Sequence, residues 1–288
     1  MSRTDSVIQY LVFTDLDGSL LDHRSYSYAQ ALPQLLKLET MGVPIIFVSS
    51  KTGAEIMQLR QEMGNAHPFI VENGAAVLIP EHYFSAPPPE SRLVDGYWVY
   101  EMSEPRTRWL ELLASLEGEY PDEFDYFYQV GSAGIVAMTG LTLAQAERAN
   151  SRQYSEPVRW LGSEQRKARF VECLLEFGAS VQTGGRFMAV SGKHDKGRAL
   201  SWLRELYKNA SPGADIYDLA VGDSNNDCAM LEAAESALLI RSPVHDFPIL
   251  QRGARGVIHS EEMGPAGWTE GVEKWLCSTR SSRDQKRV

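Results

Sequence analysis

The sequence predicts an α/β protein, a doubly wound parallel sheet with a second, inserted α/β domain. Three observations support this prediction. Apolar runs end in polar turns, predicted helices alternate with these runs, and the same pattern returns after a proline-rich interruption. A nearly continuous apolar run is typical of a parallel strand buried on both faces. Because such sheets bind ligands beyond the carboxyl ends of their strands, the residues just after the strands are the first candidates for a site.

The N-terminal part alternates strands and helices. Strands are predicted at residues 7–13, 43–48 and 68–71. A helix over 28–41 has an apolar face and stops at Gly42, and a second helix begins at Thr52 or Gly53 and reaches about residue 63. With right-handed crossovers, this order gives a parallel sheet.

The segment Pro87-Pro88-Pro89 is the clearest boundary, because it suits neither a helix nor a central strand. We expect a core of residues 1–88 and 191–288, and an inserted domain of residues 89–190 with helices near 105–116, 142–152 and 163–177. The core pattern resumes with helices at 195–208, 226–234 and 269–276, a strand into Gly222, and strands at 237–240 and 256–259. The basic, serine-rich residues 278–288 are expected to be frayed or disordered.

Composition limits the possible partners. The formal net charge of −10 argues against nucleic-acid and anionic-membrane partners, so that Lys, Arg or a metal must meet any anionic substrate. The three cysteines are odd in number and widely spaced, which argues against a disulfide framework. The histidines lack metal-ligand spacing and are expected mostly on the surface or in loops. No leader peptide or membrane-span length is found, and we expect a cytoplasmic protein.

Two acidic segments follow predicted strands. Asp15 and Asp17 come after the first strand, and Asp223 and Asp227 follow the strand that ends at Gly222. Carboxylates gathered at neighbouring strand ends are suitable ligands for Mg²⁺. A calcium loop does not fit either segment, because the positions that need Gly and Glu hold Leu20 and Tyr26 in the first and Cys228 and Ala234 in the second.

Four segments occur in the order of the motifs of the haloacid dehalogenase superfamily. They are Asp15-Leu16-Asp17-Gly18-Ser19, Ser49 at the end of the second strand, Lys196-Gly197 at a helix start, and Gly222-Asp223 through Asp227. The insertion resembles the C2-type cap of this superfamily, and Glu72-Asn73-Gly74 resembles a turn of its Cof-type sugar phosphatases. The resemblance implies a Rossmann-like core with an inserted cap.

The resemblance, together with what each step of phosphoryl transfer requires, implies a role for each of these residues. Asp15 is the expected nucleophile, which forms an aspartyl-phosphate, and Asp17 is the general acid and then the general base. Mg²⁺ is expected on the Asp15 and Asp223 carboxylates and the Asp17 backbone carbonyl. Lys196 is expected to neutralise phosphate, with Lys193 as the competing choice.

Polar residues near these catalytic and metal-binding groups are expected to assist the reaction. Ser49 is placed to bind a phosphoryl oxygen, unless it is a simple N-cap. Asp227 and Asn226 are expected to orient the lysine or a metal-bound water, although Asn226 also suits an N-cap.

Five further segments, spread over core and cap, resemble the mannosyl-3-phosphoglycerate phosphatases. They are Ser49-Ser50-Lys51-Thr52, Thr139-Gly140-Leu141-Thr142, Arg152 with Tyr154-Ser155-Glu156-Pro157, Gly184-Gly185-Arg186-Phe187, and Gly264-Pro265-Ala266-Gly267-Trp268. The expected substrate is a small phosphorylated sugar acid, and the expected reaction is a step in making the compatible solute mannosylglycerate. Glucosyl-3-phosphoglycerate, sucrose and trehalose phosphatases share much of this plan.

Several residues are expected to bind the substrate. Arg186 offers a bidentate fork for a carboxylate, and the adjacent Gly185 permits close backbone approach; a structural salt bridge is the other interpretation of Arg186. Ser50, Lys51, Thr52 and Arg152 are weaker candidates. The tryptophans of the insertion are expected mainly in its core.

Two other functions stay open at this point. A phosphomannomutase would use the same aspartyl-phosphate but return the phosphoryl group to a sugar. A sugar-phosphate sensor would bind the ligand without chemistry, although a pure binder needs no nucleophile and acid pair.

Overall fold

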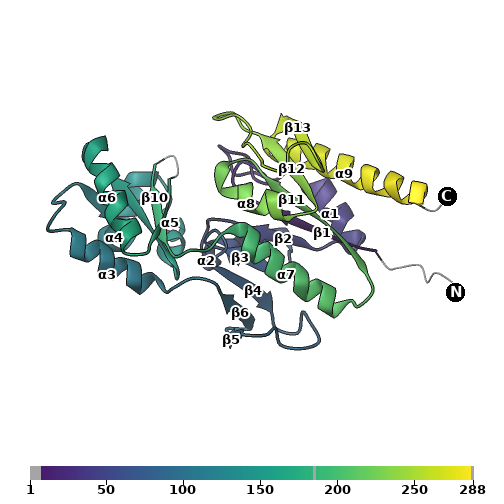
Figure 1. Ribbon diagram of the computed structural model, residues 1–288, viewed down its shortest axis with the longest axis horizontal. Helices are drawn as coiled ribbons and strands as arrows, with labels where there is room; N and C mark the ends of the chain where they lie inside the picture. The colour runs from purple at the N-terminus through teal and green to yellow at the C-terminus, as the bar shows by residue number, and fades with distance from the viewer. Residues whose placement is uncertain (1–7, 184–185, 287–288) are drawn as a thin grey trace. The chain divides into compact units, whose positions relative to one another are not determined.

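The computed structural model describes the backbone of residues 8–183 and 186–286 and the side chains of residues 8–182 and 186–279 (Figure 1). The chain divides into two compact units. The first unit comprises Met1–Ser49, Asn65–Tyr100 and Asp195–Val288, and the second comprises Ser50–Gly64 and Glu101–His194. The division into a catalytic core and a cap at residues 88 and 191 stays a prediction.

The first unit is built on a nine-stranded sheet in the order β13-β12-β11-β1-β2-β3-β4-β6-β5. Its strands are β1 Ile8–Thr14, β2 Ile45–Val48, β3 Phe69–Val71, β4 Ala76–Pro80, β5 Arg92–Val94, β6 Tyr97–Glu101, β11 Asp215–Gly222, β12 Ser236–Arg241 and β13 Val257–Met263. The pairs from β13 to β3 are parallel, while β3 with β4 and β5 with β6 are antiparallel. The predicted parallel α/β sheet is confirmed.

Strand β1 lies between β11 and β2, although some 200 residues of sequence separate it from β11. Thr14 is paired in register with Val221, and the Asp15 N–H donates to the Val221 carbonyl at 2.8 Å. The chain segments after β1 and β11 therefore leave the same edge of the sheet side by side.

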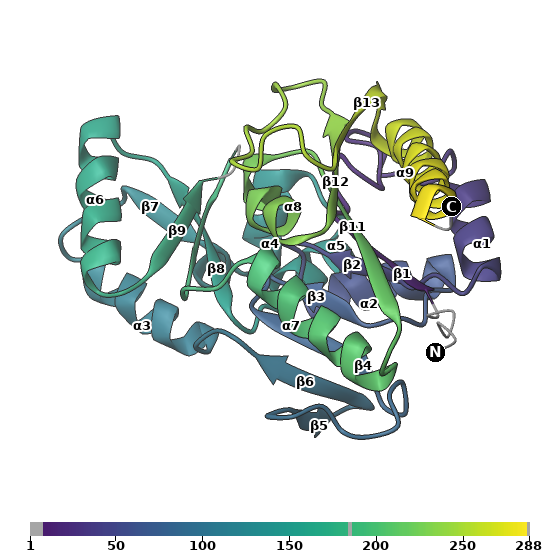
Figure 2. The same ribbon diagram turned by 45° about the vertical axis from the view of Figure 1, so that its right-hand side comes forward.

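Helices cover both faces of this sheet. They are α1 Leu32–Thr40, α7 Lys196–Ala210, α8 Cys228–Ala233 and α9 Gly264–Lys286, together with the 3₁₀ turn η1 Asn225–Asp227. In both ribbon views α1 and α9 lie side by side on one face, and α7 and α8 lie on the other (Figures 1 and 2). The fully buried Trp268 and Trp275 anchor α9 in the core.

The second unit has a four-stranded antiparallel sheet in the order β7-β8-β10-β9. Its strands are β7 Phe124–Tyr126, β8 Ser155–Trp160, β9 Ser180–Thr183 and β10 Met188–Ser191, and its helices are α2 Gly53–Met63, α3 Arg106–Leu116, α4 Phe127–Thr139, α5 Leu143–Asn150 and α6 Glu164–Glu176. Trp109 is fully buried in an aromatic core with Phe124 and Phe170.

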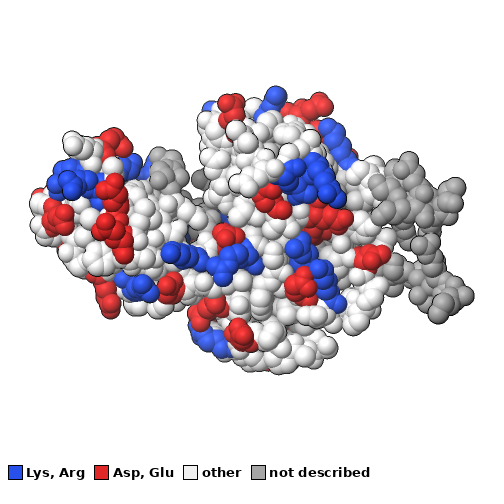
Figure 3. Space-filling model, viewed as in Figure 1, with Lys and Arg blue, Asp and Glu red and all other residues white. Residues whose placement is uncertain are grey.

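Acidic and basic side chains are interspersed on the face of the molecule shown in Figure 3.

One expectation about the helices is wrong, and one helix was not predicted. The last helix does not end at residue 276 but continues to Lys286, so residues 278–286 of the stretch expected to be frayed are helical, while residues 287 and 288 lie outside the described residues. Adding a turn to an existing helix does not require a new helix to nucleate. Helix α4 was not expected, because its interior glycines weaken the helical pattern, and Gly131 indeed interrupts it with φ 64° and ψ −179°. Within the described residues, no helix combines the length and hydropathy that a membrane span requires.

Candidate active site

Asp15 is the first residue after β1, and its surroundings fix the backbone there. The Thr14 hydroxyl donates to the Asp15 carbonyl at 2.7 Å and accepts from the Trp268 indole N–H at 3.0 Å. Asp15 is buried, and the turn through Asp17 is closed by Gly18, whose φ of 82° favours glycine. After the turn, an isolated β-bridge pairs Asp17 with Leu21.

The loop after β11 meets this turn directly. A Cβ at Gly18 would lie only 2.6 Å from Asp223 Oδ2, so that a side chain at this position would displace the Asp223 carboxylate. Asp227 Oδ2 accepts from the N–H groups of Asp223 and Ser224, both at 3.1 Å, which shapes the loop. The two acidic segments of the sequence therefore form one cluster.

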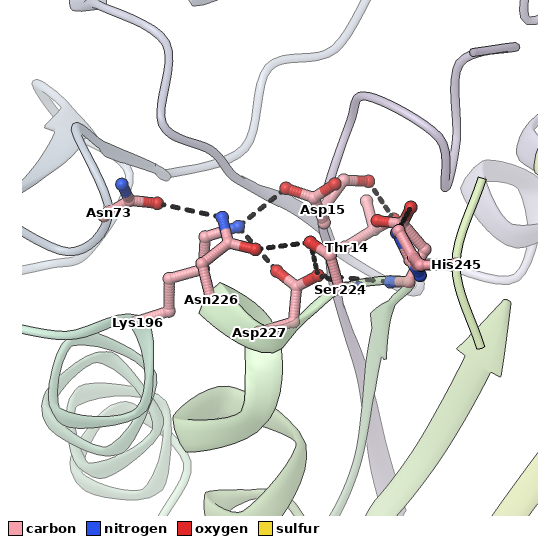
Figure 4. A network of polar contacts seen from close by, with 9 residues as sticks. Thr14, Asp15, Asn73, Lys196, Ser224, Asn226, Asp227 and His245 are labelled. Carbon is pink, nitrogen blue, oxygen red and sulfur yellow. Dashed lines mark hydrogen bonds and ion pairs between the residues drawn. The ribbon is translucent and has the colours of Figure 1, made fainter. Parts of the chain in front are cut away.

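Lys196, the first residue of α7, is the cation of this cluster (Figure 4). Its fully buried Nζ donates to Oδ1 of Asp15 and to Oδ1 of Asp227, each at 2.6 Å. Asp195 caps the helix by accepting from the Arg198 N–H at 2.8 Å. Of the two lysines considered from the sequence, it is Lys196 that contacts Asp15.

Burial and the repulsion between carboxylates raise the pKa values of Asp15 and Asp223. Burial raises the pKa of Asp15 well above its ordinary value; Asp227 and Asp223 add to the rise, and Lys196 opposes it. Burial, with the charge of Asp227, raises the pKa of Asp223 to about 6. Burial would lower the pKa of Lys196, but the charges of Asp15 and Asp227 outweigh it and raise that pKa, so the side chain stays a cation.

The carboxylates fit a divalent cation. One ligand atom each of Asp15, Asp223 and Asp227 lies within 4.8 Å of the other two, and all three residues are buried. Three carboxyl groups face the single ammonium group of Lys196, and carboxylate oxygens are the hard ligands that Mg²⁺ prefers. Asp227 already accepts hydrogen bonds at both oxygens, from Lys196 and from the backbone, whereas Asp223 contacts the Asp15 turn.

His245 is a neighbour of the cluster that the sequence did not identify. Its Nε2 lies 3.5 Å from Asp223 Oδ2, and its side chain is partly exposed in the loop after β12. The expectation of a loop position was right, but the loop follows the strand next to β11 in the sheet. That position at a strand end is the signal that could have revealed it.

Ser49 and Asn226 lie at the same edge of the sheet. Ser49 follows β2, is buried, and accepts at its carbonyl from the Asn73 N–H at 2.9 Å. Asn226 Nδ2 donates to Asn73 Oδ1 at 3.3 Å, and Asn226 Oδ1 accepts from the Ser224 hydroxyl at 2.5 Å. The turn Glu72-Asn73-Gly74 thus connects the serine with the loop after β11.

The other predicted substrate-binding residues belong to the second unit. The Arg152 guanidinium donates to the Ser50 carbonyl at 3.3 Å and to the Ser155 hydroxyl at 2.8 Å. Thr52 caps α2 in a reciprocal box with Glu55, and Lys51 lies in the same loop. Arg186 is exposed and makes a long hydrogen bond of 3.5 Å to the Met138 carbonyl. Gly185 lies outside the described residues.

Comparisons with known proteins agree on one kind of enzyme. The haloacid dehalogenase-like hydrolase family model matches residues 12–86. A glucosyl-3-phosphoglycerate/mannosyl-3-phosphoglycerate phosphatase of Methanococcoides burtonii is 33% identical over 92% of this chain and 96% of its own length. A protein of the same name from Persephonella marina is 30% identical over 92% of this chain and 97% of its own length.

A solved structure shares the fold. The sucrose-phosphatase of Synechocystis, solved in complex with sucrose and phosphate, superposes with a TM-score of 0.57 at 14% identity. The match covers 93% of this chain and 98% of that one.

Proposed function

The chain belongs to the glucosyl-3-phosphoglycerate/mannosyl-3-phosphoglycerate phosphatases, and from this we propose that it hydrolyses 2-O-mannosyl-3-phosphoglycerate to mannosylglycerate and phosphate. It is a phosphoric monoester hydrolase, a sugar phosphatase with a haloacid dehalogenase-like domain. The observation that carries the proposed mechanism is the buried contact of Lys196 with Asp15 and Asp227 at the junction of the two acidic loops. The five sequence segments quoted above favour the mannosyl ester.

In the proposed first step, an Asp15 carboxylate oxygen attacks phosphorus and the bond from phosphorus to the glycerate oxygen breaks. Asp17 gives its proton to that leaving oxygen. Lys196 donates to Asp15 Oδ1 at 2.6 Å, which favours the ionised carboxylate against the opposing effect of burial and leaves the second oxygen for the attack. The product of this step is an aspartyl-phosphate and the free sugar acid.

In the second step, a water attacks the phosphorus of the aspartyl-phosphate, Asp17 takes up the water proton, and inorganic phosphate and the Asp15 carboxylate are released. Ser49 is proposed to bind a phosphoryl oxygen in both steps. The carboxylates of Asp15 and Asp223 and the Asp17 carbonyl would hold Mg²⁺, with Asp227 orienting Lys196. When bound, the ion neutralises charge between Asp15 and the phosphoryl group.

Phosphate release tests the proposal. The purified protein with Mg²⁺ is assayed with mannosyl-3-phosphoglycerate, glucosyl-3-phosphoglycerate, sucrose phosphate and trehalose phosphate, with Asp15→Asn as the control. We expect the highest kcat/KM with the mannosyl ester and no turnover by Asp15→Asn. A clear preference for another ester would overturn the substrate, whereas full activity of Asp15→Asn would overturn the mechanism.

The glucosyl ester is a second candidate, because the names of both relatives include it. The same assay separates the remaining alternatives. Phosphoryl transfer to a sugar without net phosphate release would indicate a mutase. Binding of the ester without turnover would indicate a sensor.

A further inference from the structure

Asn73 lies at the edge of the sheet beside the candidate site, and the proposed mechanism leaves it without a role. It belongs to the turn Glu72-Asn73-Gly74 after β3, in which all three residues have positive φ, 46°, 61° and 96°. A left-handed backbone is unfavourable for most residues, and asparagine tolerates it better than most. Such strain persists where the surrounding structure fixes it, often at functional sites.

The turn is held between Ser49 and the start of α7. The Asn73 N–H donates to the Ser49 carbonyl at 2.9 Å. On the other side, a Cβ at Gly74 would lie 2.9 Å from the backbone nitrogen of Lys196. Asn73 therefore lies next to the residue proposed to bind phosphate and next to the helix that supplies the buried cation.

A short chain of hydrogen bonds orients the Asn73 side chain. The Ser224 hydroxyl donates to Asn226 Oδ1 at 2.5 Å, which leaves Asn226 Nδ2 to donate to Asn73 Oδ1 at 3.3 Å. The Asn73 oxygen consequently faces Asn226, and its amide nitrogen points away from Asn226 (Figure 4). Among the described residues, this nitrogen has no hydrogen-bond acceptor.

The Asn73 residue is only 9% exposed. Asn73 Nδ2 is not among the described buried side-chain atoms that lack a partner, so it is open to solvent, and a ligand oxygen can replace water as its acceptor. A phosphoryl group offers several oxygen acceptors, and a neutral amide can bind it without altering the charge balance of the carboxylates.

We propose that Asn73 Nδ2 donates a hydrogen bond to the phosphoryl group of the substrate, so that Asn73 is a phosphate-binding residue together with Ser49 and Lys196. This inference rests on the proposed function, since it assigns the ligand to the same site. The chemical class of the ligand is a phosphate monoester or inorganic phosphate.

Two variants separate this role from a role in shaping the turn. Asn73→Gly removes the amide and keeps a residue suited to positive φ. Asn73→Asp keeps the shape but replaces the donor with a negative charge. The affinity for inorganic phosphate is measured by calorimetry with Mg²⁺, next to kcat/KM and the melting temperature. Asp95→Gly, at φ 48° in the turn between β5 and β6, is the matched control for a left-handed glycine.

We expect Asn73→Gly to weaken phosphate binding about tenfold or more, as expected for the loss of one hydrogen bond to a charged group. Asn73→Asp should weaken it further, and Asp95→Gly should leave it unchanged. Wild-type phosphate affinity in Asn73→Gly would overturn the inference. If the wild type hydrolyses none of the sugar esters, the proposed function fails, while phosphate calorimetry still tests Asn73.

Discussion

Lys196 is the residue on which the charge balance of the site depends. Its Nζ lies 2.6 Å from an oxygen of Asp15 and from an oxygen of Asp227, and all three side chains are buried. Removing one partner of a buried ion pair leaves a charge that neither water nor protein compensates, which costs about 3–5 kcal/mol. The effect of a substitution here should therefore be large.

We expect Lys196→Met to lower the free energy of unfolding by about 3–5 kcal/mol and to abolish measurable phosphate release. Urea denaturation and a phosphatase assay measure the two effects. The matched control is Lys193→Met, which removes the competing lysine and should change neither quantity appreciably. Wild-type kcat in Lys196→Met, or inactivity of Lys193→Met alone, would reverse the assignment.

The pKa of Asp223, raised by burial from its ordinary 3.8 to about 6, predicts a pH dependence of the metal-free protein. The folded state binds this proton more tightly than the unfolded state, so the stability it contributes is complete below about pH 4 and is lost as the pH rises through about 6. We expect the melting temperature of the metal-free protein to fall over this range, Mg²⁺ to restore it, and Asp223→Asn to flatten the curve. A metal-free melting temperature that rises over this range would contradict this interpretation.

At the residue scale, the sequence predicted the groups that directly follow strands in the chain. Asp15 and Asp223 could be paired because each follows a recognisable apolar run. His245 was not identified, although it also follows a predicted strand, and Asn73 was recognised only as part of the turn Glu72-Asn73-Gly74. Their closeness to the cluster depends on the order of the strands in the sheet and on a left-handed turn, neither of which one sequence reveals.

At the scale of elements, α9 is connected to β1 by one hydrogen bond beneath the nucleophile. The Trp268 indole N–H donates to the Thr14 hydroxyl, which in turn donates to the Asp15 carbonyl. Trp275 is equally buried in the same helix, but among the described residues its indole nitrogen has no acceptor. The two tryptophans form a natural matched pair.

We expect Trp268→Phe to destabilise the protein by about 1 kcal/mol more than Trp275→Phe, because only the first change breaks a buried hydrogen bond. Trp268→Phe should also lower kcat, since the Asp15 backbone loses its support. Thermal denaturation and kcat of both variants measure this. Equal losses of stability and equal kcat values in the two variants would show that the indole hydrogen bond has no such role.

Long amphipathic elements were predictable, and interrupted or short ones were not. Helices α2, α3 and α6 lie close to their expected bounds because their apolar spacing is regular. The short strands β4, β5 and β6 were not expected, because pairing within the sheet, more than local sequence, stabilises segments of three to five residues.

At the scale of the whole molecule, the chain crosses between its two compact units four times, after Ser49, Gly64, Tyr100 and His194. Helix α2 belongs to the second unit, where Thr52 donates to the Arg148 carbonyl at 2.8 Å. The residues that follow the proposed phosphate-binding Ser49 are therefore stabilised by contacts within the second unit. This division was not readable from composition, because α2 continues the strand and helix alternation of the core.

The central claim is that Asp15 attacks phosphorus with its carboxylate fixed by Lys196. The most direct measurement is a rapid acid quench of the enzyme during turnover of mannosyl-3-phosphoglycerate, followed by peptide mass spectrometry. The account predicts a transient phosphoryl group on the peptide that contains Asp15, located on Asp15 itself, and none in Asp15→Asn. Turnover at the wild-type rate with no phosphoryl group on Asp15, or with one on another residue, would contradict it.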